Sequence, residues 1–241
     1  MFCFFNALGL STPIFSAYAK SSSGGFIFKS CKFTFSVNLL YTLQLRDIKS
    51  GLGEMAHYYL VSNLNDWIFF KNNMKNVIKK DFNKHIMKSL IYKSLRIKKK
   101  FIEKDEFDRG PRLILNYGHT FGHAIEKITN YNIPHGMAVA HGINMSNFFS
   151  LQYKLISLKT FMDIQLQMKK IVNLSELKKL NVRHFLETIK KDKKNKKNQI
   201  RLILTKGYGK MFIKSIRNDL LFVSFLKKYF NYVANGTSII R

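Results

Sequence analysis

A stripe of polar residues suited to chemistry follows Pro111. Arg112, Asn116, His119 and His123 are spaced four, three and four residues apart, so on an α-helix with 3.6 residues per turn they share one face. Most of the residues between them are apolar, which predicts a buried helix. Because burial of an unpaired charge is costly, an arginine beside two histidines there requires an anionic or metal partner.

A further histidine, His135, lies sixteen residues after His119 and begins the next predicted helix. A catalytic zinc site uses three protein ligands and keeps one position open. Glu54 is the best candidate for a carboxylate ligand, because it lies among small and apolar residues where an unpaired carboxylate is unfavourable. Glu54, His119 and His135 are therefore the predicted metal ligands.

The histidine pair is also compatible with two other kinds of site. Residues 119–123 (HTFGH) have the histidine spacing of a zinc-protease signature, but Thr120 stands where that motif needs a glutamate base. Histidines on helices also serve as hydrogen-bonded core residues, and spacing alone leaves this open. Gly118 and Gly122 each weaken a helix by about 1 kcal/mol relative to alanine, which predicts a close approach of backbone or substrate there.

The elements that position these residues are mostly helical. Hydrophobic periodicity and turn signals predict helices at 47–63, 64–88, 89–103, 112–129, 135–158, 160–171, 175–180, 183–190 and 218–232. Short strands at 200–205 and 211–216 flank a Gly-Tyr-Gly turn and predict a hairpin. Partial alternation of apolar residues over 26–37 predicts a strand. Residues 192–198 are rich in lysine and are predicted to form a basic loop.

Composition limits the class of partner. The chain has 241 residues, 46% of them hydrophobic, and 41 Lys plus Arg against 14 Asp plus Glu give a net charge of +27. Such a charge suggests nucleic acid, an acidic membrane surface or a phosphorylated substrate. Lys, Asn, Ile, Phe and Tyr are abundant along the whole chain, so we attribute the charge mainly to a coding bias at surface positions. No nucleic-acid module is present, and no specific nucleic-acid partner is predicted.

The compartment is predicted from the cysteines and the N-terminus. Cys3 and Cys31 form neither a disulfide framework nor a cysteine metal site. No apolar run reaches the roughly 18 residues of a membrane span. Residues 1–19 are apolar and end in Ala17-Tyr18-Ala19, similar to a signal-peptidase site, but no basic residue begins them. The prediction is a cytoplasmic protein with no membrane partner.

The motifs resemble a known family. Residues 115–126 (LNYGHTFGHAIE), followed by 135–139 (HGMAV), are similar to the signature of 3-dehydroquinate synthases, which are sugar-phosphate cyclases. Residues 50–54 (SGLGE) resemble the family's Gly-Leu-Ala-Glu, and 41–43 (YTL) its Thr-Leu beside the dinucleotide. Residues 192–194 and 200–204 resemble its Asp-Lys-Lys and following strand, so the similarity covers roughly 36–225.

The resemblance implies a fold and a domain division. The expected fold class is mainly α: the multi-helical C-terminal domain of the dehydroquinate-synthase-like fold, with a short strand remnant at the N-terminus and a small hairpin near 200–216. Residues 1–45 would be a degenerate or truncated remnant of the dinucleotide-binding domain. Residues 46–241 would be the helical metal- and substrate-binding domain.

The resemblance also implies roles. Glu54, His119 and His135 would hold Zn²⁺ or Co²⁺. The other implied residues are catalytic His123 and Lys98, substrate-binding Arg112, Asn116, His57, Lys193 and Lys194, and NAD-contacting Thr42 and Leu43. The reaction would be an NAD- and metal-dependent lyase step that eliminates phosphate from a seven-carbon keto sugar acid and closes a ring, within the shikimate pathway of aromatic amino acid biosynthesis. A sugar phosphate is the implied small-molecule partner, and a homodimer is left open.

Three departures from the family pattern leave alternatives. Residues 21–25 (SSSGG) resemble part of the family's Gly-rich segment, but Phe26 replaces its lysine, and most of the dinucleotide-binding half does not match this sequence. His57 replaces a usual lysine and Met137 a usual glutamate. A cyclase for another sugar phosphate, such as sedoheptulose 7-phosphate, and a non-catalytic remnant that binds metal or anions both stay open. Because most of the dinucleotide-binding half does not match, we expect an incomplete NAD site and no useful turnover by this chain alone.

Overall fold

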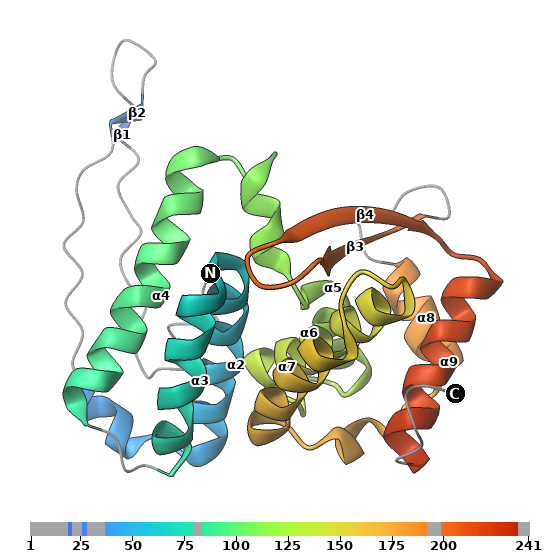
Figure 1. The fold of residues 1–241 in the computed structure, drawn as a ribbon, viewed down its shortest axis with the longest axis horizontal. Coiled ribbons are helices and arrows are strands. Elements are labelled where there is room, and N and C mark those ends of the chain that lie inside the picture. Colours follow the sequence, from blue (N-terminus) through green and yellow to red (C-terminus); the bar gives the residue numbers. More distant parts are fainter. Residues whose placement is uncertain (1–18, 21–25, 28–36, 80–82, 192–198, 236–241) are drawn as a thin grey trace.

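The structure, a computed structural model, describes residues 19–20, 26–27, 37–79, 83–191 and 199–235. These residues form a predominantly helical assembly with a hairpin across one side of α5 and α6 (Figure 1). In chain order the elements are β1 (Ala19–Lys20), β2 (Phe26–Ile27), the 3-10 helix η1 (Val37–Thr42), α2 (Leu45–Ser62), α3 (Leu64–Ile78), α4 (Lys84–Lys104), the 3-10 helix η2 (Pro111–Asn116), α5 (His119–Ile128), α6 (His135–Gln152), α7 (Leu158–Ile171), the 3-10 helix η3 (Leu174–Leu177), α8 (Val182–Lys190), β3 (Gln199–Thr205), β4 (Met211–Arg217) and α9 (Leu220–Asn235). The predicted mainly α fold class is confirmed.

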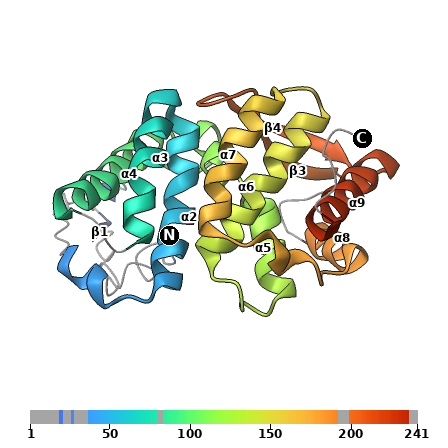
Figure 2. The same cartoon turned by 60° about the horizontal axis from the view of Figure 1, so that its bottom comes forward.

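Helix α6 is the centre of this assembly. Residues 136–150 are all buried, because most of them are apolar or small on every side of the helix, and such a helix is stable only inside a protein. It packs against α2, α5, α7 and strand β3, and Figures 1 and 2 show α5, α6 and α7 side by side. Every element that borders α6 is therefore oriented by the same core.

Glycines let α6 touch its neighbours backbone to backbone. A Cβ on Gly136 would lie 1.8 Å from the carbonyl oxygen of Ser50 in α2, and one on Gly53 would lie 2.0 Å from that of Gly136. At the crossing with α5, a Cβ on Gly142 would lie 1.9 Å from the carbonyl oxygen of Gly118. Since real Cβ atoms do not approach this closely, only glycine fits. The predicted close approach at Gly118 is present, and the N-terminus of α6 is held against the middle of α2.

The predicted continuous helix over 112–129 is wrong. The chain forms η2, passes through Tyr117, and restarts as α5 at His119. Gly118 between them has φ +83°, in the left-handed region that interrupts a right-handed helix. Arg112 and Asn116 therefore lie on a different element from His119 and His123, and the four residues do not form a stripe on one helix face.

Other predicted boundaries need smaller corrections. The break between the second and third predicted helices lies near residues 79–83, because the Asn83 side chain accepts from the backbone N–H of His85 at 2.7 Å and starts α4. The helix predicted to reach 158 ends at Gln152, and Lys154 takes φ +57°. The helix predicted over 175–180 is the short η3.

The predicted strands have mixed outcomes. Strands β3 and β4 pair antiparallel with Gln199 opposite Arg217 and Thr205 opposite Met211, as predicted for the hairpin. Phe26 and Ile27 lie in a strand, whereas Val37 begins η1; residues 28–36 and the basic loop 192–198 lie outside the described residues. Within the described ranges, no helix combines the length and apolar character needed to cross a membrane.

Candidate metal centre

Glu54 on α2 lies at the centre of a histidine cluster. Its side-chain Oε2 lies 3.5 Å from His135 Nε2, 3.8 Å from His119 Nε2 and 4.0 Å from His57 Nδ1. Glu54 is only 8% exposed, and its Oε2 makes no hydrogen bond to any described residue. A buried carboxylate oxygen ringed by imidazoles and lacking a hydrogen bond suits a site that a cation completes.

The separations are close to those of a metal site. With zinc–ligand bonds of about 2.0–2.2 Å, neighbouring ligand atoms of a tetrahedral ion lie roughly 3.3–3.6 Å apart. The Glu54–His135 separation of 3.5 Å falls inside this range, and the Glu54–His119 separation of 3.8 Å exceeds it by only about 0.2 Å. Each of these two histidine nitrogens therefore lies at or near the distance from Glu54 Oε2 at which both atoms can bind one ion, and the donor set fits zinc or cobalt.

Outer partners orient both histidines. His135 Nδ1 donates to Glu126 Oε1 at 3.1 Å, and His119 Nδ1 donates to the Tyr117 carbonyl oxygen at 3.3 Å. Because Nδ1 is engaged in these bonds, Nε2 of each ring is the nitrogen that faces Glu54 and is available to a metal, the arrangement that metal-binding histidines usually have. Glu126, 8% exposed, was missed as a functional residue. Its position seven residues after His119, two helical turns along the same face, is a signal that could have identified it.

The cluster is larger than the predicted triad. Two compact groups occur among the described residues, and in each the ligand atoms lie within 4.8 Å of one another: Glu54 with His57 and His119, and His119 with His123 and His135. The His123 ring centroid lies 5.4 Å from that of His119 and 5.7 Å from that of His135. The structure thus brings the three predicted ligands together and adds His57 and His123 beside them.

Burial and neighbouring charges set the protonation states. Burial lowers the pKa of His57 to about 4, and lowers the pKa of His119 well below its usual value, although Glu54 opposes both shifts. Burial also acts to lower the pKa of His135, but the hydrogen bond to Glu126 and the nearby Glu54 carboxylate outweigh it and raise that pKa to about 10. Burial acts to raise the pKa of Glu54, yet His57 and His135 hold it far below its usual range. The ionised Glu54 and the neutral His57 and His119 are in the forms that bind a divalent ion, whereas His135 must release a proton to bind one.

Two cations lie beside the cluster. The Lys98 ammonium on α4 lies 5.7 Å from the ring centroid of Tyr58. Burial lowers the pKa of Lys98, while the charge of Glu54 raises it and that of Arg112 lowers it, so both groups lie within electrostatic range. Arg112 Nη1 donates to the Glu106 carbonyl oxygen at 2.7 Å. The predicted Lys98 and Arg112 therefore share the surroundings of Glu54.

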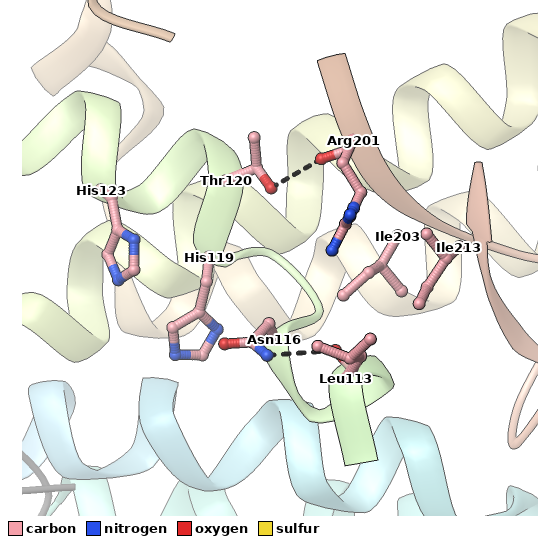
Figure 3. Close-up of a pocket in the computed structure, with 8 residues that line it drawn as sticks. All are labelled: Leu113, Asn116, His119, Thr120, His123, Arg201, Ile203 and Ile213. Atoms are coloured by element: carbon pink, nitrogen blue, oxygen red, sulfur yellow. Dashed lines mark hydrogen bonds between the residues drawn. The ribbon is translucent and has the colours of Figure 1, made fainter. Parts of the chain in front are cut away.

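A pocket adjoins the histidines on the side of the hairpin (Figure 3). Its lining consists of Leu113, Asn116, His119, Thr120, His123, Arg201, Ile203 and Ile213. Thr120 Oγ1 donates to the Arg201 carbonyl oxygen at 3.1 Å, which fastens β3 to α5. Arg201 was not among the predicted site residues. Successive side chains of a strand point to opposite faces, so the buried Leu202 was the available signal that Arg201 faces away from the core.

Four other residues are predicted to contact NAD or substrate. Thr42 ends η1, and the partly buried Leu43 packs against the hydrophobic core. Lys193 and Lys194 lie outside the described residues. Contacts of these four residues with NAD or substrate stay predictions.

Comparison with solved structures defines the fold. The chain superimposes on 2-deoxy-scyllo-inosose synthase complexed with carbaglucose-6-phosphate, NAD⁺ and Co²⁺ with a TM-score of 0.69 and 20% identity, covering 79% of this chain and 55% of that one. It matches 2-epi-5-epi-valiolone synthase from Streptomyces hygroscopicus, with NAD⁺ and Zn²⁺ bound, with a TM-score of 0.68 and 13% identity, covering 83% and 54%. The fold is that of the sugar-phosphate cyclases.

Sequence comparison identifies the family. Residues 51–195 match the family described as 3-dehydroquinate synthase C-terminal. The 3-dehydroquinate synthase of Bartonella bacilliformis is 32% identical over 234 residues, covering 93% of this chain and 61% of that protein. That of a Thermoanaerobacter species is 34% identical over 184 residues, covering 75% and 51%. The chain belongs to the 3-dehydroquinate synthase family, and it spans between half and about three-fifths of the length of these curated relatives.

Proposed function

We propose that residues 46–241 form the metal- and substrate-binding domain of a 3-dehydroquinate synthase-type sugar-phosphate cyclase, and that residues 1–45 correspond to part of its dinucleotide-binding domain. One observation carries the proposal: an unpaired, buried Glu54 oxygen faces the Nε2 atoms of His135 and His119 at 3.5 and 3.8 Å. We propose Zn²⁺ or Co²⁺ as the ion. The solved structures with the same fold hold Co²⁺ or Zn²⁺, which supports this choice.

The proposed ion would be held by Glu54, His119 and His135. When bound, it supplies Lewis-acid polarisation of a substrate oxygen. Glu126 keeps His135 turned toward the site through the 3.1 Å hydrogen bond to Nδ1. His123 lies next to both histidine ligands, and we assign it to proton exchange with a substrate hydroxyl at one of its ring nitrogens.

The proposed substrate is an anionic sugar phosphate. Lys98 and Arg112 would bind its phosphate and carboxylate, since charge-assisted hydrogen bonds to such groups are strong and stabilise a departing phosphate. Asn116, whose side-chain Nδ2 now donates to the Leu113 carbonyl oxygen at 3.1 Å, would bind a hydroxyl. Lys193 and Lys194 are assigned to the same anionic groups from the family resemblance.

The elimination also needs a hydride acceptor, and NAD is the proposed cofactor. Thr42 and Leu43 are its proposed contacts, and the solved neighbours hold NAD⁺. Because the chain spans at most about three-fifths of these relatives, we assign the rest of the dinucleotide site to a segment beyond residues 46–241. The cysteine usage favours a reducing, cytoplasmic setting.

A second substrate is supported by one observation. His57 is buried at the site and its pKa is lowered to about 4, so it supplies no positive charge at neutral pH where family members usually carry a lysine. A substrate without the carboxylate of the seven-carbon acid, such as sedoheptulose 7-phosphate, needs fewer cations. Activity on this sugar phosphate is therefore the alternative within the same class.

Metal binding is the first test. The purified chain is expected to bind about one zinc or cobalt ion, with nitrogen and carboxylate ligands, and His119→Ala is expected to lower the affinity sharply. X-ray absorption that shows sulfur ligands would refute the assignment. Metal that is retained by the double variant His119→Ala/His135→Ala would refute it as well.

Turnover is the second test. Phosphate release would be measured with NAD and cobalt, using the seven-carbon keto acid phosphate and sedoheptulose 7-phosphate in parallel, with Arg112→Ala as the control. We expect little turnover by residues 46–241 alone, because the elimination also needs NAD and the proposed contacts with it, Thr42 and Leu43, precede this domain. NAD-dependent turnover that disappears in Arg112→Ala would show that residues 1–45 or a partner chain complete the site.

A further inference from the structure

His57 has a buried nitrogen for which the proposed chemistry provides no partner. It lies on α2 one helical turn after Glu54 and is 1% exposed. Its Nδ1 makes no hydrogen bond within the described part of the chain, and the nearest carboxylate oxygen, Glu54 Oε2, lies 4.0 Å away. Leaving a buried polar atom unpaired costs about 1–3 kcal/mol, so a partner for Nδ1 would stabilise the site.

The position of Nδ1 is nearly as suitable for a metal ligand as that of the assigned histidines. The atom faces the same Glu54 oxygen as His119 and His135. Relative to a tetrahedral spacing of about 3.4 Å, His57 must move about 0.6 Å closer to that oxygen and His119 about 0.4 Å. The ligand atoms of Glu54, His57 and His119 already lie within 4.8 Å of one another, and the His57 ring meets the His119 ring edge-on with centroids 5.0 Å apart.

We propose that His57 is a fourth protein ligand of the metal ion and binds it through Nδ1. This inference rests on the metal centre of the proposed function. The site then has one carboxylate from Glu54 and three imidazoles, two of them presented by Nε2 and one by Nδ1. His123 belongs to the other compact group, with His119 and His135, and is not part of this set.

A fourth protein ligand changes what the site can do. A catalytic zinc site keeps one position open for water or substrate, whereas four protein ligands close a tetrahedral site. A sugar phosphate would then have to raise the coordination number to five or displace His57. The chain is therefore expected to hold its ion tightly and to exchange an added oxygen ligand slowly.

The test uses cobalt in the full chain and compares two histidine variants. X-ray absorption counts the imidazoles, visible absorption reports the coordination geometry, and chelator competition gives the affinity. We expect three imidazoles and the intense absorption of four-coordinate cobalt in the unmodified protein. His57→Gln should show two imidazoles, weaker absorption, and a loss of affinity larger than the roughly 100-fold typical of losing an outer-shell partner. The matched His123→Gln should keep three imidazoles and its affinity.

The outcomes separate this inference from the proposed function. If the unmodified chain binds no metal, the proposed function fails. If it binds cobalt through two imidazoles and a carboxylate, and His57→Gln leaves the spectrum unchanged, the metal centre stands and the role of His57 is refuted. Loss of an imidazole in His123→Gln instead would also refute it. If His57→Gln does not fold, as judged by circular dichroism, the imidazole count of the unmodified protein decides.

Discussion

Replacing Gly136 by alanine should separate the two helices that hold the candidate metal ligands. Gly136 follows His135 directly, and its backbone lies against the carbonyl oxygen of Ser50, one turn before Glu54. A Cβ there would lie 1.8 Å from that oxygen and 3.0 Å from the Glu54 backbone nitrogen. Both atoms belong to the backbone of a helix, so they cannot rotate away as the end of a side chain would.

The size of the displacement decides the effect on metal binding. Ordinary contact begins near 3.4 Å, so the alanine requires the helices to move apart by about 1.6 Å. Added to the present 3.5 Å between Glu54 Oε2 and His135 Nε2, this gives roughly 5 Å. One ion with bonds of about 2.1 Å spans at most about 4.2 Å between two ligands. The Gly136→Ala chain should therefore lose one of these ligands.

Metal affinity and thermal stability should be measured together. Overpacking of this kind costs about 1–3 kcal/mol, and for a chain of this size each 1 kcal/mol lowers Tm by about 2–4 °C. The matched control is Gly122→Ala, where the new Cβ would lie 3.1 Å from the Ala138 carbonyl oxygen and needs only a few tenths of an ångström; it should have a much smaller effect. A folded Gly136→Ala protein that binds zinc with unchanged affinity would refute the reasoning.

Three further predictions concern separate features. Glu126→Ala should lower zinc affinity about 10- to 100-fold by releasing His135 Nδ1, and unchanged affinity in a chelator competition would contradict this. Asp163 accepts hydrogen bonds from Trp67, Lys71 and Tyr208, which outweigh burial and lower its pKa; the stability it contributes is present above its ordinary pKa of 3.8 and is lost as pH falls through the lower folded value. Asp163→Asn should therefore flatten the acid limb of a Tm–pH curve, and an unchanged limb would count against this. Binding to duplex DNA should be weak, indifferent to sequence and strongly dependent on salt, and tight binding at moderate salt would show that the +27 charge serves nucleic acid.

Much of the architecture follows from local pattern. Periodicity at 3.6 residues and turn signals predicted most of the helices, and alternation around residues 207–209 predicted the hairpin. These signals are local, because each depends on which faces of a single element are apolar. These local signals fail where two backbone conformations are compatible with the same pattern of apolar residues. In the sequence, Gly118 is one glycine of low helix propensity within a helical pattern. In the structure, its φ of +83° divides the predicted helix into η2 and α5.

Part of the candidate site was likewise identified from the sequence, and part only from the tertiary structure. The residue types and motifs alone singled out Glu54, His119 and His135 and the family to which the chain belongs. Only the tertiary structure decided that Glu126 orients His135, that Arg201 lines the neighbouring pocket, and that the Nδ1 of His57 faces the same oxygen as the predicted ligands. Spacing along the chain describes one helix at a time, whereas these contacts arise where α2, α5, α6 and the hairpin meet. Their distances depend on the backbone contacts that glycine permits at the helix crossings.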